Sequence, residues 1–198
     1  MNKRRIKTLF LSLAVLLPSI MYAAVGCDLN DPDRDVKRFF PSSTSYKTQY
    51  VSVKDAGGEA LLKSIEQRLG DKFIGLYETI DVPYTIYIIY KGKEKIGYIH
   101  GVNQKGTYGG IQVFLALDTK FKILNLYFQK MTSKSTKKFR DKNFTDQFTG
   151  LTINDFNNKK SKLSLIKSPD EKAEADFKII LRGIKKNLIL MDVFMGVK

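Results

Sequence analysis

Two groups of residues in this chain have the chemistry to hold a ligand. The first is Tyr108 followed by Gly109 and Gly110, where backbone without side chains can approach a ligand closely. The second is a polar, cationic loop whose hydroxyls and ammonium groups suit a phosphate. Its members are Thr132, Ser133 and Lys134, with Lys137 nearby. Both groups also have an interpretation without a ligand. The first can simply be the start of a strand, and the second can be a solvated basic turn.

The motifs that would assign a familiar chemistry to these groups are missing. The sequence GTYGGIQVF at 106–114 lacks the Lys-Ser or Lys-Thr of a phosphate-binding loop, and it leads into a predicted strand instead of a helix. The nucleophile motif GxSxG of hydrolases is absent. His100 is the only histidine, so no metal site is expected.

The first 27 residues have the order of a secretory leader. A basic start, MNKRRIK, precedes the apolar run TLFLSLAVLLPSIMYAA, and small residues lead to Cys27, the only cysteine. The apolar run is shorter than a comfortable membrane span and contains Pro18. This order predicts export from the cytoplasm.

Cys27 itself has three interpretations. It can be the lipid acceptor of a lipoprotein, because Val25 and Gly26 precede it, although Ala24 replaces the commoner Leu. It can be a free thiol after cleavage of an ordinary signal peptide, or it can follow an uncleaved anchor. All three predict an extracytoplasmic domain. With one cysteine, no intrachain disulfide can form.

The charge of the chain favours an anionic surface as its neighbour. The formal net charge is +14, and removal of residues 1–27 takes away four basic residues and no acid, which leaves +10. The basic residues are mostly Lys and are spread along the chain, which suits the surface of an anionic membrane. A nucleic-acid partner is not expected outside the cytoplasm.

The periodicity of apolar residues predicts an α+β fold: a twisted antiparallel sheet of two hairpins, packed against a long C-terminal helix and shorter helices. Residues 28–38 are polar and predict a tether, and 39–198 predict one domain. The expected elements are an edge strand at 46–53, a helix at 57–70 with Ala60, Leu61, Ile65 and Leu69 on one face, hairpins at 84–101 and 110–130, a short helix at 143–151 and a long helix at 170–194.

Two patterns predict which elements are buried. Val113, Leu115 and Leu117 alternate with Phe114 and Ala116, so this strand is apolar on both faces and is expected to be central. The last helix carries a nearly continuous apolar stripe. The residues of that stripe are Phe177, Ile180, Leu181, Ile184, Leu188 and Met191, and the short helix adds Phe144 and Phe148.

The order of these segments resembles the FMN-binding domain family. The resemblance is carried by FFPSSTSY, by the Gly-Gly-Ile strand start, by the hairpin ALDTKFKILNLYFQ and by FTDQFTG, and it spans about residues 39–192. Members include subunits of sodium-pumping quinone reductases and of the Rnf complex, and extracytoplasmic lipoproteins. The resemblance implies FMN as the cofactor, a role in electron transfer at the membrane, and Tyr108 either stacked on the flavin or packed at the rim.

The chain departs from the family where the flavin is attached. Family members often esterify FMN to a Thr in an S-G-A-T segment at the start of the last helix, and here that segment reads EKAE, with Glu174 at the acceptor position. A carboxylate cannot replace the missing hydroxyl, and it repels a phosphate. The family's Glu-Thr-Pro-Gly-Leu-Gly loop is replaced by MTSKSTKKF, which keeps only Thr132. Flavin is therefore expected to be non-covalent, if it is bound at all.

Three functions remain open from the sequence. The first is an electron carrier that is tethered to the membrane and works with a membrane redox complex. The second is a flavin-free scaffold or assembly lipoprotein that binds a partner protein. The third is a surface lipoprotein that contacts host or envelope polymers, which rests on charge and the export signal alone. All of these functions describe a carrier or a binding module rather than a stand-alone enzyme. The acids Asp170, Glu171 and Glu174 fit the second without a ligand, because acids stabilise the first turn of a helix.

Overall fold

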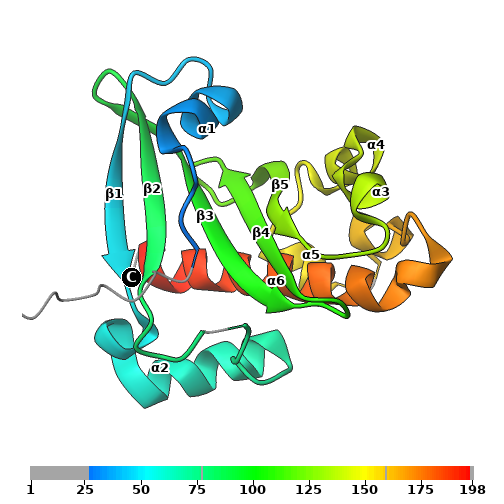
Figure 1. Ribbon diagram of the computed structural model, residues 1–198. Helices are drawn as coiled ribbons and strands as arrows, with labels where there is room; N and C mark the ends of the chain where they lie inside the picture. The colour runs from blue at the N-terminus through cyan, green and yellow to red at the C-terminus, as the bar shows by residue number, and fades with distance from the viewer. Residues whose placement is uncertain (1–26, 77, 159, 197–198) are drawn as a thin grey trace, which may run out of the picture.

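The chain folds as an α+β domain built on one antiparallel sheet, as predicted. The computed structural model describes residues 27–76, 78–158 and 160–196, so the predicted leader lies outside it except for Cys27. The five strands are arranged in the order of the sequence, β1-β2-β3-β4-β5, and α6 crosses one face of the sheet (Figure 1). No helix of the described chain is long and apolar enough to cross a membrane.

The strands form a simple meander, and both predicted hairpins are confirmed. All four neighbouring pairs are antiparallel. The strands are β1 (Ser45–Val51), β2 (Tyr84–Lys91), β3 (Glu94–Lys105), β4 (Gly110–Leu117) and β5 (Ile123–Met131).

Helices cover the sheet and follow its last strand. They are α1 (Pro32–Phe39), α2 (Val53–Leu69), α3 (Thr136–Arg140), α4 (Lys142–Thr145), α5 (Ile153–Asn157) and α6 (Glu174–Met195), with 3-10 turns η1 (Asp146–Phe148), η2 (Lys162–Leu165) and η3 (Glu171–Ala173). Gly57 and Gly58 kink α2 instead of starting it, because Ser52 caps an earlier turn by accepting from the Asp55 amide. Gly70 ends α2 with φ 74°, as expected, but Ala60 is exposed.

The core has two layers, one on each face of the sheet. The α6 face buries Val113, Leu115 and Leu117, and the opposite face buries Phe114 and Ala116, so the prediction that this strand is central is confirmed. The stripe on α6 is buried except for Leu181, which is half-buried. The rings of Phe144 and Phe148 are also in the core, with centroids 5.3 Å apart.

Residues 28–38, expected to form a tether, fold onto the sheet instead. Asp31 caps α1 by accepting from the Arg34 amide at 3.1 Å, and Pro32 occupies the first turn, where its missing N–H costs nothing. Leu29 and Val36 are buried against the second face of the sheet. The reason is that the sheet is apolar on both faces and α6 covers only one. This segment is part of the domain.

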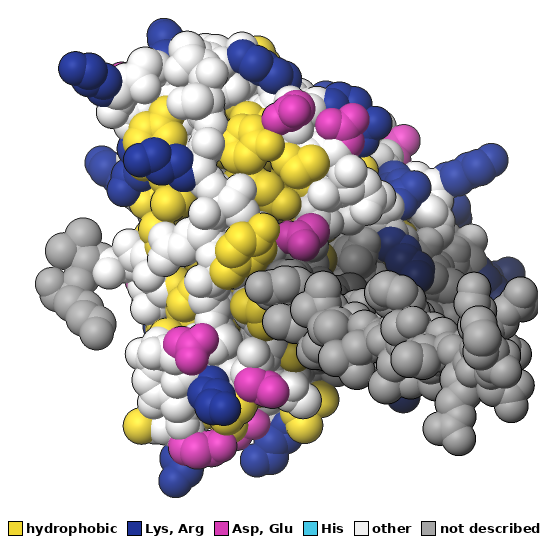
Figure 2. Space-filling view, turned by 60° about the vertical axis from the view of Figure 1, so that its left-hand side comes forward, with side chains coloured by type: hydrophobic (Ala, Val, Ile, Leu, Met, Phe, Trp, Pro, Cys, Tyr) yellow, Lys and Arg dark blue, Asp and Glu magenta, His cyan; other side chains and the backbone are white. Residues whose placement is uncertain are grey.

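The two outer strands, β1 and β5, form the edges of the sheet. Figure 2 shows the face that carries β1, where apolar side chains form a broken stripe with both basic and acidic side chains around it. Tyr50 on β1 is 60% exposed, and Lys47 on the same strand is also exposed. A lysine on an edge strand opposes pairing with another chain. The other edge, β5, faces α3 and α4.

Candidate functional site

The structure brings the two predicted ligand-binding groups together. The turn between β3 and β4 lies against the loop that follows β5, because the Thr132 amide donates to the Gly110 carbonyl at 3.0 Å. The turn is closed by the Gly106 amide, which donates to the Gly109 carbonyl at 2.8 Å. The start of α6 adjoins both, through Asp176, whose carboxylate accepts from the Thr107 amide.

The two glycines have different structural roles. Gly109 has φ +149°, which L side chains rarely adopt, and a Cβ there would lie 3.0 Å from the Thr132 Cβ. Gly110 opens β4, and a Cβ there would meet only the end of the Leu76 side chain, at 3.1 Å. The close approach at Gly109 is therefore made to another part of the chain, which explains this glycine without a ligand.

Gly109→Ala is expected to destabilise the fold by about 1–3 kcal/mol, because it forces a strained backbone angle and a contact with Thr132. Gly110→Ala is the matched control and is expected to cost less than about 1 kcal/mol, since the Leu76 side chain can move. Urea unfolding measures both. Equal losses in the two variants would contradict this assignment.

Tyr108 lies at the surface of this region. Its side chain is 50% exposed, and the Lys134 ammonium lies 4.9 Å from the centroid of its ring. This cation–π contact joins the two predicted groups. The exposed ring offers a flat surface, and it also fits the interpretation as rim packing.

Asp176 is the buried anion of the cluster, and sequence analysis missed it. The residue is 1% exposed, and its Oδ1 accepts from the Thr107 amide at 2.8 Å. Burial acts to raise the pKa of Asp176, but hydrogen bonds from Ser133 and Thr107 outweigh burial and lower it. The carboxylate is thus ionised, and it places a negative charge beside the loop that was expected to hold a phosphate. The one signal in the sequence was an acid in the first turn of the last helix.

A second acid fixes the loop after β5 to the start of the last helix. Asp170 accepts from the Ser135 hydroxyl at 2.5 Å and pairs with the Lys138 ammonium at 3.1 Å. These contacts, with the Ser135 hydroxyl as the largest cause, lower the pKa of Asp170 to about 2. Glu174 is exposed at the first position of α6. The acids predicted to stabilise the helix start therefore also hold the neighbouring loop.

This arrangement does not suit the phosphate of FMN. The Thr107 amide already donates to the Asp176 carboxylate. An added phosphate would also meet the negative charges of Asp176 and Glu174. Two unit charges about 4 Å apart repel by about 1 kcal/mol in bulk water, and by more where burial lowers the dielectric constant. The residues present suit the chain's own Asp176 carboxylate better than the phosphate of a nucleotide.

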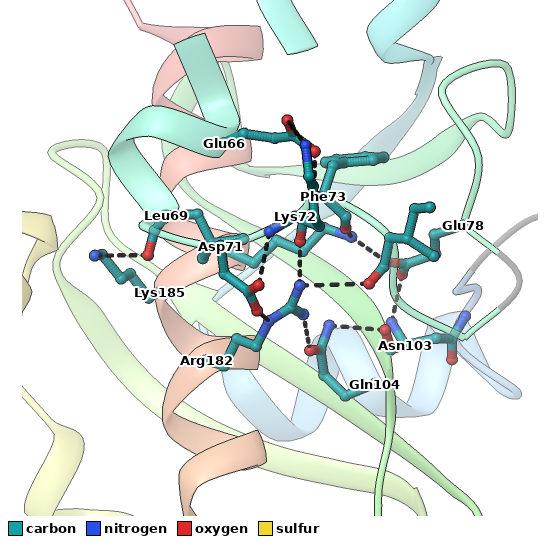
Figure 3. Close-up of polar contacts among 12 residues, drawn as sticks. Glu66, Leu69, Asp71, Lys72, Phe73, Glu78, Asn103, Gln104, Arg182 and Lys185 are labelled. Carbon is teal, nitrogen blue, oxygen red and sulfur yellow. Dashed lines mark hydrogen bonds and ion pairs between the residues drawn. The ribbon is translucent and has the colours of Figure 1, made fainter. Parts of the chain in front are cut away.

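A larger polar network, also missed, fixes the loop between α2 and β2 (Figure 3). Lys186 and Glu78 form an ion pair in which both side chains are fully buried. The Lys186 ammonium also donates to the Phe73 carbonyl at 2.8 Å, and the Asn103 amide donates to Glu78 at 2.6 Å. The pairing of β2 with β3 ends before Asn103, so β2 does not bond the Asn103 amide. The Glu78 carboxylate accepts that hydrogen bond instead.

Arg182 closes the same network nearer the surface (Figure 3). Its guanidinium pairs with Asp71 at 2.6 Å and bonds the Gln104 side chain and the Lys72 carbonyl. The loop is therefore held to both α6 and β3. Charged residues on a mostly apolar helix were visible in the sequence, but their acidic partners lie more than 100 positions away and could not be paired with them from the sequence.

Cys27 lies inside the domain. Its Sγ is 3.7 Å from the Asn103 Oδ1, and the residue is 1% exposed. Burial, followed by the nearby charges of Glu78 and Asp28, raises the pKa of the thiol well above its ordinary value. Lipidation of Cys27 stays a prediction, and an attached lipid would require this residue to withdraw from the core.

No known family model and no curated protein sequence matches this chain. In the part of the chain that the structure describes, no three His, Cys, Asp or Glu side chains are grouped so that they could hold a metal ion.

Proposed function

We propose that this domain is a flavin-free binding module that stands outside the cytoplasm at a membrane surface and engages a partner protein. The export and the membrane tether in this proposal rest on the leader sequence and Cys27. The basic net charge of +14 fits an anionic membrane as the neighbour.

The observation that carries the proposal is the buried carboxylate of Asp176. In a domain of the FMN-binding type, the start of the last helix is where the flavin phosphate is attached. Here Asp176 stands in that turn and takes the Thr107 amide. Glu174 stands where the attachment hydroxyl would be. Both changes favour a domain that keeps its sheet as a rigid frame without the cofactor.

A non-covalent flavin domain that acts in electron transfer is the second candidate. It is favoured by one observation, the half-exposed ring of Tyr108 beside Gly109 and Lys134. A flavin bound there would supply the redox chemistry, and the chain would supply only an aromatic surface and one cation. The negative charges at the start of α6 argue against the phosphate end of that ligand.

Titration with FMN separates the two candidates. The full-length chain is purified in detergent, its absorbance at about 450 nm is recorded, and free FMN is then added while flavin fluorescence is followed. The proposal predicts a colourless protein and no change in FMN fluorescence. A yellow protein, or saturable quenching that Tyr108→Ala abolishes, would replace it with the second candidate.

A further inference from the structure

The middle of the β5 edge has no hydrogen-bond partner outside the sheet in the described chain. At the start of the strand, the Ile123 amide donates to the Leu151 carbonyl at 2.9 Å. Near its end, the Gln129 carbonyl accepts from the Arg140 guanidinium at 3.1 Å. Between these two points, the backbone of residues 125–128 is bonded by no helix or loop that the structure describes. The edge is closed at both ends and open in between.

The pairing with β4 decides which backbone groups point outward. Successive residues of an antiparallel strand turn alternately toward the partner and away from it. Ile123 turns away from β4, and Thr132 turns toward it, since its amide donates to Gly110. One extra residue of β5 lies in each half of the ladder. Counting from either end gives the same result: the N–H and C=O groups of Leu126 and Phe128 point outward.

This open stretch lies in a groove of about 460 Å³. Arg38 and Phe39 of α1 line one side, and Arg140 and Lys142 of α3 and α4 line the other. Tyr127 stands between them, with the Arg38 guanidinium 4.0 Å from the centroid of its ring. Figure 1 shows the same arrangement, with β5 as the outermost strand and α3 and α4 beyond it. The groove thus combines unpaired backbone, aromatic surface and cations.

The charge of the groove is positive. Its lining has three cations, Arg38, Arg140 and Lys142, and one acid, Asp146, which pairs with Lys142 at 2.7 Å. Arg38 pairs with the buried Asp35 at 3.4 Å. Within the described residues, no carboxylate lies within ion-pair distance of Arg140, whose guanidinium bonds only the Gln129 backbone carbonyl there. Arg140 is therefore the cation best placed to receive an acid from outside.

We propose that the β5 groove binds an extended, acidic segment of a partner protein by strand addition, an inference that rests on the proposed partner-binding function. The backbone of the segment pairs with the outward groups of Leu126 and Phe128. A carboxylate of the segment pairs with the Arg140 guanidinium, a geometry in which arginine can form two parallel hydrogen bonds. Phe39 and Tyr127 supply the apolar contact.

Two other occupants fit less well. An anionic lipid headgroup would use the cations but would leave the outward N–H and C=O groups of Leu126 and Phe128 without partners. A second copy of this chain would bring two strongly basic proteins together, since each has a formal charge of +14 with residues 1–27 and +10 without them. An acidic peptide satisfies both the backbone and the charge.

The test compares three probe peptides by fluorescence anisotropy with the full-length chain in detergent. The first is a labelled acidic peptide of sequence Thr-Val-Glu-Val-Glu-Val-Thr with blocked ends. The second has Lys in place of Glu. The third keeps the Glu residues but is N-methylated at every backbone amide, which removes the N–H donors of both edges and leaves the charge unchanged. The protein variants are Arg140→Ala and, as a control on the opposite sheet edge, Lys47→Ala.

We expect saturable binding of the acidic peptide alone, weakened about tenfold or more by Arg140→Ala and unchanged by Lys47→Ala. Equal binding of the N-methylated peptide would overturn strand addition, because it would show attraction by charge only. Binding that is insensitive to Arg140→Ala, or no binding, would also overturn the proposal. Self-association in sedimentation experiments that the peptide displaces would assign the groove to a second copy. If the protein is colourless and flavin-free but does not bind the peptide, the proposed function still stands and only the proposed site at β5 is rejected.

Discussion

Lys186→Met is expected to lower the free energy of unfolding by about 3–5 kcal/mol. The substitution leaves the Glu78 carboxylate fully buried without its cation, and a buried unpaired charge is strongly unfavourable. It also removes the donor to the Phe73 carbonyl. For a chain of this size the melting temperature should fall by on the order of 10 °C. Urea and thermal unfolding of the full-length chain measure both quantities.

A double variant shows whether the loss comes from the stranded charge. Glu78→Gln combined with Lys186→Met removes both charges and keeps an acceptor for the Asn103 amide, so we expect it to be more stable than Lys186→Met alone by about 2 kcal/mol. Lys185→Met is the matched control. Lys185 donates to the Leu69 carbonyl at 3.0 Å, and its loss should cost about 1 kcal/mol. Additive losses in the double variant would contradict this account of the network.

Lowering the pH from about 6.5 to about 4 should weaken the fold by roughly 3 kcal/mol through His100 alone. The ring is fully buried, and its Nδ1 lies 2.9 Å from the Asn187 Oδ1, which must accept because the Asn187 amide donates to two backbone carbonyls. Burial, opposed by the bond to Asn187, lowers the pKa of His100 from 6.5 to about 4. Between these values the unfolded chain binds a proton that the folded chain does not, so stability falls as the pH falls.

His100→Gln separates this effect from the titration of the carboxylates. The variant keeps a side-chain donor toward Asn187 but has no ionisable group, so its stability should change less between pH 6.5 and 4 than that of the unaltered chain. The carboxylates are common to both proteins and cancel in the difference. Parallel pH profiles from urea unfolding would show that His100 does not titrate in this way.

The sequence predicted the sheet well because its signals are local. Alternating apolar residues at 113–117 and the stop at Gly70 decide strand and helix over a few positions, and the structure confirms both. The segment 28–38 was misjudged because it contains many charged residues. Its two buried apolar side chains, Leu29 and Val36, pack against the second face of the sheet, a role that the local sequence does not indicate.

The candidate site was predicted in part. Both predicted groups lie side by side, with Gly109 against Thr132, because the hairpins place both loops at the same end of the sheet. The contact of Asp176 with this cluster could not be predicted from the sequence, since its carboxylate accepts a hydrogen bond from the backbone amide of Thr107, 69 positions earlier. The ion pair of Glu78 and Lys186 could not be predicted for the same reason, because its members lie far apart in the sequence. Contacts of this kind produce no periodic pattern from which they could be predicted.

The central claim is that the domain carries no flavin, and the native protein tests it most directly. The protein is isolated from its own cell envelope and precipitated with acid, and FMN is then measured in both the supernatant and the precipitate. The account predicts no flavin in either fraction. One flavin per chain in the supernatant would show a non-covalent flavin domain, and one flavin per chain in the precipitate would show a covalent bond despite Glu174. Either result would contradict the claim.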